Sequence, residues 1–118
     1  MARIIIVDDY KDLQDFFKAL LELNHFEVRS AGSAKELNTL LESFVPDLIL
    51  LDVMLGADSG IKICKEIKEK HKEIAVILIS ANPKLLIGYE ACNADDIIEK
   101  PFDMHVVLDK INKLLAKR

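Results

Sequence analysis

The chain has 118 residues, of which 51% are hydrophobic and 31% charged, so it has the size and composition of one globular domain. Its net charge is −4, with Lys and Arg scattered among acids rather than gathered in a basic stripe, which argues against direct binding of nucleic acid. No apolar run approaches the roughly 20 residues that cross a bilayer, and the start is no signal peptide, so we expect no membrane segment and a cytoplasmic location.

Two kinds of segment alternate along the chain. Short runs of aliphatic and β-branched residues predict strands, and apolar residues recurring every three or four positions predict helices. In chain order the expected elements are a strand at 4–7, a helix with the apolar face Leu13, Phe16, Phe17, Leu20 and Leu21, a strand at 26–28, a helix with Leu37, Leu40, Leu41 and Phe44, a strand at 48–51, a helix with Ile63, Cys64 and Ile67, a strand at 74–79, a fourth helix near 84–90, a strand at 97–98, and a last helix with Met104, Val107, Leu108, Ile111, Leu114 and Leu115.

The helix boundaries carry capping signals. Ser33 with Glu36 three residues later forms a capping box, Gly60 opens the third helix, and Asp103 caps the last one. Short strands joined by helices require a parallel sheet with right-handed crossovers and helices on both faces. We therefore predict an α/β fold with one doubly wound five-stranded parallel sheet, a flavodoxin-like (βα)5 arrangement of strand order 2-1-3-4-5, with the mixed second strand at an edge.

Polar residues follow the predicted strands at their carboxyl ends, where open α/β sheets bind ligands. Asp8 and Asp9 follow the first strand, Asp52 ends the third, Ser80 ends the fourth and Lys100 follows the fifth. Because the first and third strands are neighbours in this topology, three carboxylates converge at one crevice, with a hydroxyl and an ammonium across from them. Taken singly, each residue also has an ordinary structural explanation, as a helix cap, a turn residue or a solvated lysine.

The cluster has a chemistry that separate residues lack. Three close carboxylates repel one another, and oxygen ligands with room for waters suit Mg²⁺. Lys100 and Ser80 suit phosphate oxygens, the first by charge and the second by a hydrogen bond. A carboxylate nucleophile, a metal, a cation and a hydroxyl are the parts needed for phosphoryl transfer to an aspartate.

Four stretches, "IIIVDDY", "PDLILLDVMLG", "VILISAN" and "ADDIIEKPF", resemble the receiver domain of two-component response regulators, over essentially residues 1–118. The resemblance implies that Asp52 accepts a phosphoryl group from the phosphohistidine of a sensor histidine kinase or phosphotransfer protein. Ser80 would then hydrogen-bond the phosphoryl group and Lys100 would pair with it. It also implies a signalling domain that acts by changing protein–protein contacts, including a phosphorylation-dependent dimer, rather than an enzyme for other substrates.

The same resemblance implies a set of metal ligands. Asp9 and Asp52 would bind Mg²⁺ directly, Asp8 would act largely through water, and the main-chain carbonyl of Met54 would be a further ligand. The bond between Lys100 and Pro101 would be cis, aiming the lysine.

Several positions depart from the family pattern. Ile97 stands where the family has its switch aromatic, so the usual switch is in doubt. The loop at 56–60 lacks the common Pro-Gly and Met-Asp-Gly, which predicts greater mobility. Asn93 replaces a common Gly and tolerates left-handed geometry almost as well.

Two other functions were weighed against the receiver interpretation. A haloacid-dehalogenase-type phosphatase would need Asp-x-Asp after the first strand, where this chain has Asp8-Asp9-Tyr10. A flavin-binding flavodoxin would need a hydroxyl- and glycine-rich phosphate loop there. The start at Met1 favours a stand-alone receiver over one excised from a longer regulator.

The remaining reactive side chains have structural explanations. Cys64 and Cys92 are in no CxxC arrangement and are expected to be reduced packing residues. The three histidines lack ligand spacing and are expected at the surface, and Phe102 is expected to anchor the last helix to the core.

Overall fold

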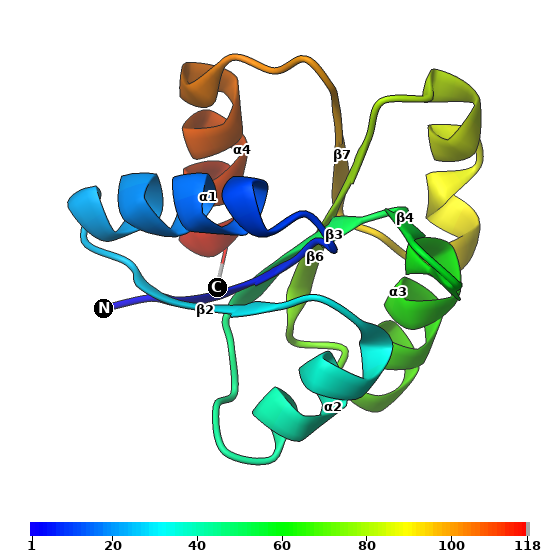
Figure 1. The fold of residues 1–118 in the computed structure, drawn as a ribbon, viewed down its shortest axis with the longest axis horizontal. Coiled ribbons are helices and arrows are strands. Elements are labelled where there is room, and N and C mark those ends of the chain that lie inside the picture. Colours follow the sequence, from blue (N-terminus) through cyan, green and yellow to red (C-terminus); the bar gives the residue numbers. More distant parts are fainter. Residues whose placement is uncertain (118) are drawn as a thin grey trace.

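The computed structural model describes residues 1–117 and has one five-stranded parallel sheet (Figure 1). The sheet has the order β2-β1-β3-β6-β7, and a separate two-stranded pair, β4-β5, follows β3. The strands are β1 (Arg3–Val7), β2 (Glu27–Ala31), β3 (Leu48–Asp52), β4 (Met54–Leu55), β5 (Asp58–Ser59), β6 (Ala75–Ser80) and β7 (Asp96–Glu99). The five sheet strands stand in the predicted order 2-1-3-4-5, with the mixed second strand at an edge.

Four α-helices cover the two faces of the sheet. They are α1 (Lys11–Leu23), α2 (Ala34–Leu41), α3 (Gly60–Lys70) and α4 (Met104–Ala116). Figure 1 shows α1 and α4 on one face and α2 and α3 on the other. Alternate residues of the buried strands feed the two cores: Ile4 and Ile6 pack with α1 and α4, whereas Ile5 and Val7 pack with α2 and α3. Within residues 1–117, no helix combines the length and apolar character that a bilayer crossing needs.

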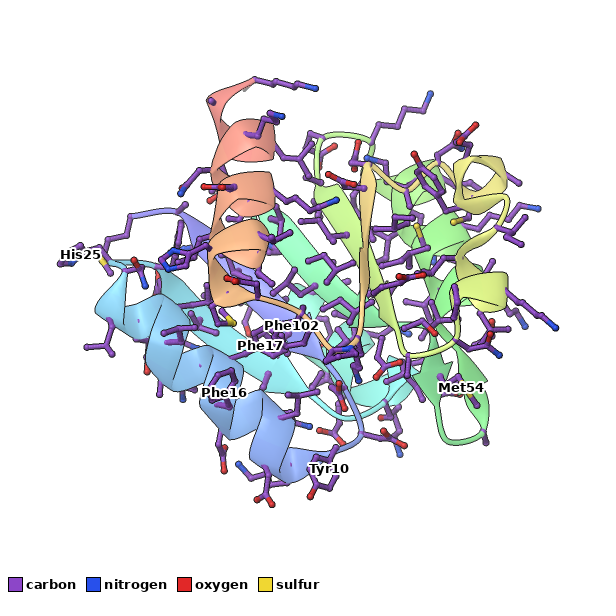
Figure 2. The ribbon with its side chains drawn as sticks, turned by 90° about the horizontal axis from the view of Figure 1, so that it is seen from above. Tyr10, Phe16, Phe17, His25, Met54 and Phe102 are labelled. Carbon is purple, nitrogen blue, oxygen red and sulfur yellow. The ribbon has the colours of Figure 1, made fainter. Side chains whose placement is uncertain are left out.

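The helix caps follow the predicted residues. The Ser33 hydroxyl accepts the Glu36 N–H at 3.2 Å, and the Glu36 carboxylate in turn accepts the N–H of Gly32. Asp103 accepts the N–H of His105 at the start of α4. Just before α4, Phe102 stacks on Phe17 of α1 with ring centroids 5.1 Å apart (Figure 2), which confirms its role as an anchor.

The prediction of a fourth α-helix near 84–90 is wrong. Two 3₁₀ turns occupy this connection, η1 (Pro83–Leu86) and η2 (Tyr89–Cys92). Between them Ile87 is extended, with ψ 131°, and Gly88 is left-handed, with φ 76°. Neither conformation continues a helix, so the α-helical hydrogen bonds cannot run through the segment.

The predictions for the smaller features of the fold are confirmed. Asn93 is left-handed, with φ 65°, and the Lys100–Pro101 bond is cis. Cys64 and Cys92 are buried free thiols, with the Cys64 thiol donating to the Cys92 carbonyl at 3.5 Å. Burial, and next the Cys92 thiol, raises the pKa of Cys64, as expected of a packing residue.

Side chains satisfy the outer edge of β7. The Lys110 ammonium donates to the Asp96 carboxylate and to the main-chain carbonyl of Ile97, both at 2.9 Å. The same Asp96 oxygen accepts the N–H of Ile97 at 2.8 Å. Both main-chain groups of Ile97 are therefore hydrogen-bonded by side chains of the chain itself.

Candidate functional site

The parallel topology brings the polar strand ends to one edge of the sheet. Val7 pairs with Leu51, Asp52 with Ile79, and Ser80 with Glu99, so the carboxyl ends of β1, β3, β6 and β7 are level with one another. Asp52 is the last residue of β3, and Ser80 is the last residue of β6. The strand ends that carry Asp52 and Ser80 therefore lie at one edge of the sheet, the edge at which the site is expected.

Lys100 joins the two buried acids of this edge. Its ammonium lies 3.0 Å from Oδ2 of Asp52 and 3.6 Å from Oδ2 of Asp8. Its main-chain N–H donates to the Ser80 carbonyl at 2.9 Å, which fixes the start of the cis Lys100–Pro101 segment against β6. Burial alone lowers the pKa of Lys100, but the bonds and charges of Asp52 and Asp8 outweigh it and raise the pKa overall. The ammonium therefore stays charged at neutral pH.

Asp8 is the acid most affected by its surroundings. It is 4% exposed, its N–H donates to Ala31 in β2 at 3.0 Å, and its Oδ1 accepts the N–H of Tyr10 at 2.9 Å. Burial raises the pKa of Asp8 from 3.8 to about 6, because the N–H of Tyr10 and Lys100 only partly oppose burial and the nearby Asp52 raises it further. A further positive charge at the site would therefore stabilise the ionised form of Asp8.

The main chain of the following loop and of the start of α3 packs closely against Asp52. It is 8% exposed, and its Oδ1 accepts the N–H of Met54 at 2.9 Å. Gly60 opens α3 directly against it: a Cβ on Gly60 would lie 2.2 Å from the Asp52 carbonyl oxygen. Only glycine permits this approach, and it lets the N–H of Gly60 reach the carbonyl of Val53 at 2.8 Å. The strand end that carries Asp52 is therefore fixed in place.

Two predicted site residues lie differently from these three. The Ser80 hydroxyl is buried and bonds within its own loop, accepting the Asn82 N–H at 3.1 Å and donating to the Asn82 carbonyl at 3.3 Å. Asp9 is exposed, and its Oδ2 would be 3.6 Å from a Cβ on Gly56, so it faces the loop after β3. Tyr10 and Met54, both exposed, lie at the outside of the molecule (Figure 2).

The loop after β3 carries a feature that the sequence did not reveal. Met54 and Leu55 pair with Ser59 and Asp58 as a short antiparallel hairpin, β4-β5. The Asp58 carboxylate accepts the N–H of Ala34 at 3.0 Å, which ties the loop to the start of α2. These contacts oppose the mobility that the loop's composition predicts. This hydrogen bond joins residues 24 positions apart, so no local sequence pattern predicts it.

The donor set fits a hard divalent ion. Within residues 1–117 no group of three His, Cys, Asp or Glu side chains forms a ready-made metal cage. Mg²⁺ does not require one, because it is commonly held by one or two carboxylates, water and phosphate oxygens. Asp8 and Asp52 share Lys100, so one ammonium balances two buried carboxylates, and burial raises the pKa of Asp8. An oxygen-seeking cation at this edge would complete that balance.

Comparison with known proteins identifies the family. The family model of the response regulator receiver domain matches residues 4–112. The chain belongs to this family. It is 33% identical over 119 residues to the transcriptional regulatory protein CpxR of Klebsiella pneumoniae, an alignment that includes 99% of this chain and 50% of CpxR. The receiver chain thus spans about half the length of the curated relatives it matches.

Solved structures agree with this assignment. The receiver domain of NtrX from Brucella abortus superposes with a TM-score of 0.91 at 28% identity, covering 98% of this chain and 99% of that one. The response regulator TrrA from Thermotoga maritima, solved in complex with Mg²⁺-BeF, superposes with a TM-score of 0.88 at 28% identity, covering 97% and 99%. The predicted fold and the receiver interpretation are confirmed, and the phosphatase and flavodoxin alternatives are not supported.

Proposed function

We propose that Asp52 of this receiver accepts a phosphoryl group from a sensor histidine kinase or a phosphotransfer protein. The observation that carries the proposal is the Lys100 ammonium, 3.0 Å from Asp52 and 3.6 Å from Asp8. Asp52 is the carboxylate between this cation and the hairpin loop, so it is the natural nucleophile. In the transfer, one Asp52 oxygen forms the new P–O bond while the bond from phosphorus to the donor's imidazole nitrogen breaks.

The receiver's own groups have separate roles in this reaction. Lys100 would move its contact from the Asp52 oxygen to a phosphoryl oxygen, which keeps the charge paired throughout. Ser80 would exchange its bonds to Asn82 for one to the phosphoryl group, which requires the loop after β6 to shift. The N–H of Met54 already holds one Asp52 oxygen in position.

The implied metal is Mg²⁺, which would be held by Asp9 and Asp52 directly, by Asp8 largely through water, and by the carbonyl of Met54. When bound, it would neutralise the carboxylates and the charge of the transferring phosphoryl group. The solved relative in complex with Mg²⁺-BeF supports the choice of metal by similarity.

The test uses acetyl phosphate as the phosphoryl donor. With Mg²⁺ present, intact-protein mass spectrometry should show one added phosphoryl group on the wild type and none on Asp52→Asn. Asp109→Asn is the matched control, because Asp109 is an exposed acid on α4 and should leave labelling unchanged. Labelling of Asp52→Asn at the wild-type rate would contradict Asp52 as the phosphoacceptor. Undiminished Mg²⁺-dependent labelling of Asp9→Ala would contradict Asp9 as a metal ligand.

The proposed mode of output is the one that the family resemblance implies. Residues 1–118 would act as one cytoplasmic receiver unit that catalyses only its own phosphotransfer and dephosphorylation. Phosphorylation would change protein–protein contacts, through a partner or through a dimer. Because Ile97 replaces the family's switch aromatic and has few side-chain rotamers, the change would travel by main-chain shifts in 81–90 rather than by rotation of a ring.

A further inference from the structure

Gln14 is a buried polar residue on an otherwise apolar helix face. It lies in α1, is 8% exposed and stands on the side of the helix that buries Phe17 and Leu21. Burying an amide among apolar groups is costly unless it is hydrogen-bonded. Its Nε2 donates to the main-chain carbonyl of Asp8, at the short distance of 2.5 Å. The buried amide of α1 is therefore hydrogen-bonded to one main-chain oxygen of the site, that of Asp8.

The bonded carbonyl belongs to the peptide that links the two acids of the site. Its carbon is part of Asp8 and its nitrogen is part of Asp9, so the plane of this peptide sets the direction in which Asp9 leaves the strand. On the other side of Asp8, its N–H donates to Ala31 at 3.0 Å. One hydrogen bond from β2 and one from Gln14 thus restrain the main chain on both sides of the Asp8 α-carbon.

The surroundings leave space for this amide. A Cβ on Gly32, in the turn after β2, would lie 3.4 Å from the Gln14 Nε2 and 3.8 Å from the Asp8 carbonyl oxygen. The amide therefore sits between α1 and the ends of β1 and β2, near the Glu36 carboxylate, and its bond into the site is to the Asp8 carbonyl and not to an acid side chain of the pair. Its influence on the site has to pass through the main chain.

We propose that Gln14 is a positioning residue that fixes the Asp8–Asp9 peptide in the orientation needed for binding Mg²⁺. The inference rests on the proposed function, because it assigns the acid pair to the metal. Two acids joined by a restrained peptide lose little main-chain freedom when the ion binds, whereas a free peptide would have to be ordered at that moment. Groups that orient metal ligands commonly change affinity 10- to 100-fold when removed, and one acting through the main chain should be worth about 3- to 10-fold.

The test compares Mg²⁺ binding by the full chain and by Gln14→Met, which keeps most of the side-chain volume but has no donor. Titration with MgCl₂, followed by amide chemical shifts of the unphosphorylated protein, gives the dissociation constant without any phosphoryl transfer. We expect it to rise about 3- to 10-fold in Gln14→Met and less in Gln14→Asn, whose amide is one methylene shorter. In labelling with acetyl phosphate, the half-saturating Mg²⁺ concentration should rise by the same factor, while the rate at saturating Mg²⁺ stays within about twofold.

Val107→Ala is the control for a purely structural effect. Val107 is fully buried in α4, so its truncation destabilises the same core layer without contacting the acid pair. It should lower the melting temperature and leave the Mg²⁺ dissociation constant unchanged. An unchanged Mg²⁺ dissociation constant in Gln14→Met, or an equal rise of that constant in Val107→Ala, would overturn the role of Gln14 but not the proposed function. A wild type that binds no Mg²⁺ would overturn the proposed function and this inference together.

Discussion

Replacing Asp8 by Asn should stabilise the metal-free protein at neutral pH. The pKa of Asp8 is about 6 in the folded chain against 3.8 for an unperturbed aspartate, chiefly because the side chain is buried. Between these two values the folded protein holds a proton that the unfolded chain releases. The stability of the fold therefore falls as the pH rises from about 4 to about 6, and at pH 7.5 the full cost of the ionised, buried Asp8 is present.

The size of the effect follows from the same two pKa values. At about 1.4 kcal/mol per pH unit, the interval between 3.8 and about 6 corresponds to about 3 kcal/mol of unfolding free energy. The attraction of Lys100 for Asp8 is already contained in the folded-state pKa, so its loss in Asp8→Asn needs no separate allowance. For a chain of this length, 3 kcal/mol corresponds to a melting temperature about 10 °C higher.

The assay is urea denaturation of wild type and Asp8→Asn without divalent ions, at pH 7.5 and at pH 4.5. The variant should be more stable at pH 7.5 by up to about 3 kcal/mol, and the difference should shrink markedly at pH 4.5. Added Mg²⁺ should stabilise the wild type more than the variant and so reduce the difference at pH 7.5. A difference that is the same at both pH values, or a wild type that is the more stable protein at pH 7.5, would refute the cost assigned to ionised Asp8.

Other parts of the fold give sharper mutational tests. Gly60→Ala, which forces a Cβ to 2.2 Å from a main-chain oxygen, should cost about 3 kcal/mol or prevent folding, whereas Gly88→Ala, at φ 76° with open space around it, should cost about 1 kcal/mol in urea denaturation. Lys68→Met removes a nearly buried ammonium that bonds the carbonyl of Ile74, and calorimetry should show a loss of about 2 kcal/mol with phosphorylation unchanged. In Ile97→Ala, beryllofluoride should still shift the amide resonances of residues 82–90; shifts that vanish while the mimic still binds would show that Ile97 is the relay.

The sequence was informative where local pattern and topology agree. Apolar runs such as Ile4–Val7 can be stable only as buried strands, and a parallel sheet then brings their carboxyl ends to one edge. Asp8, Asp52 and Lys100 follow or end such strands, and the structure has the two ion-pair distances that this topology predicts.

The sequence was uninformative where a contact is long-range or a local preference is overridden. The pattern at 84–90 suits a helix, but Gly88 in its left-handed conformation divides the segment into two 3₁₀ turns. The hydrogen bond from the Ala34 N–H to the Asp58 carboxylate depends on how α2 packs beside the hairpin loop. In the sequence Gln14 resembles any polar residue of an amphipathic helix. Only the structure shows its hydrogen bond to the Asp8 carbonyl.

The hydrogen bonds along β7 have a consequence for the protein in a crowded solution. An outer strand with free N–H and C=O groups is a template on which strands of other molecules can add, the first step toward fibrous aggregates. In this receiver, Asp96 and Lys110 occupy both main-chain groups of Ile97 at the middle of that strand. Replacing Lys110 by Met would free the Ile97 carbonyl and place another apolar side chain beside it. Lys110 thus opposes the addition of strands from other molecules to β7, and it also links α4 to the sheet.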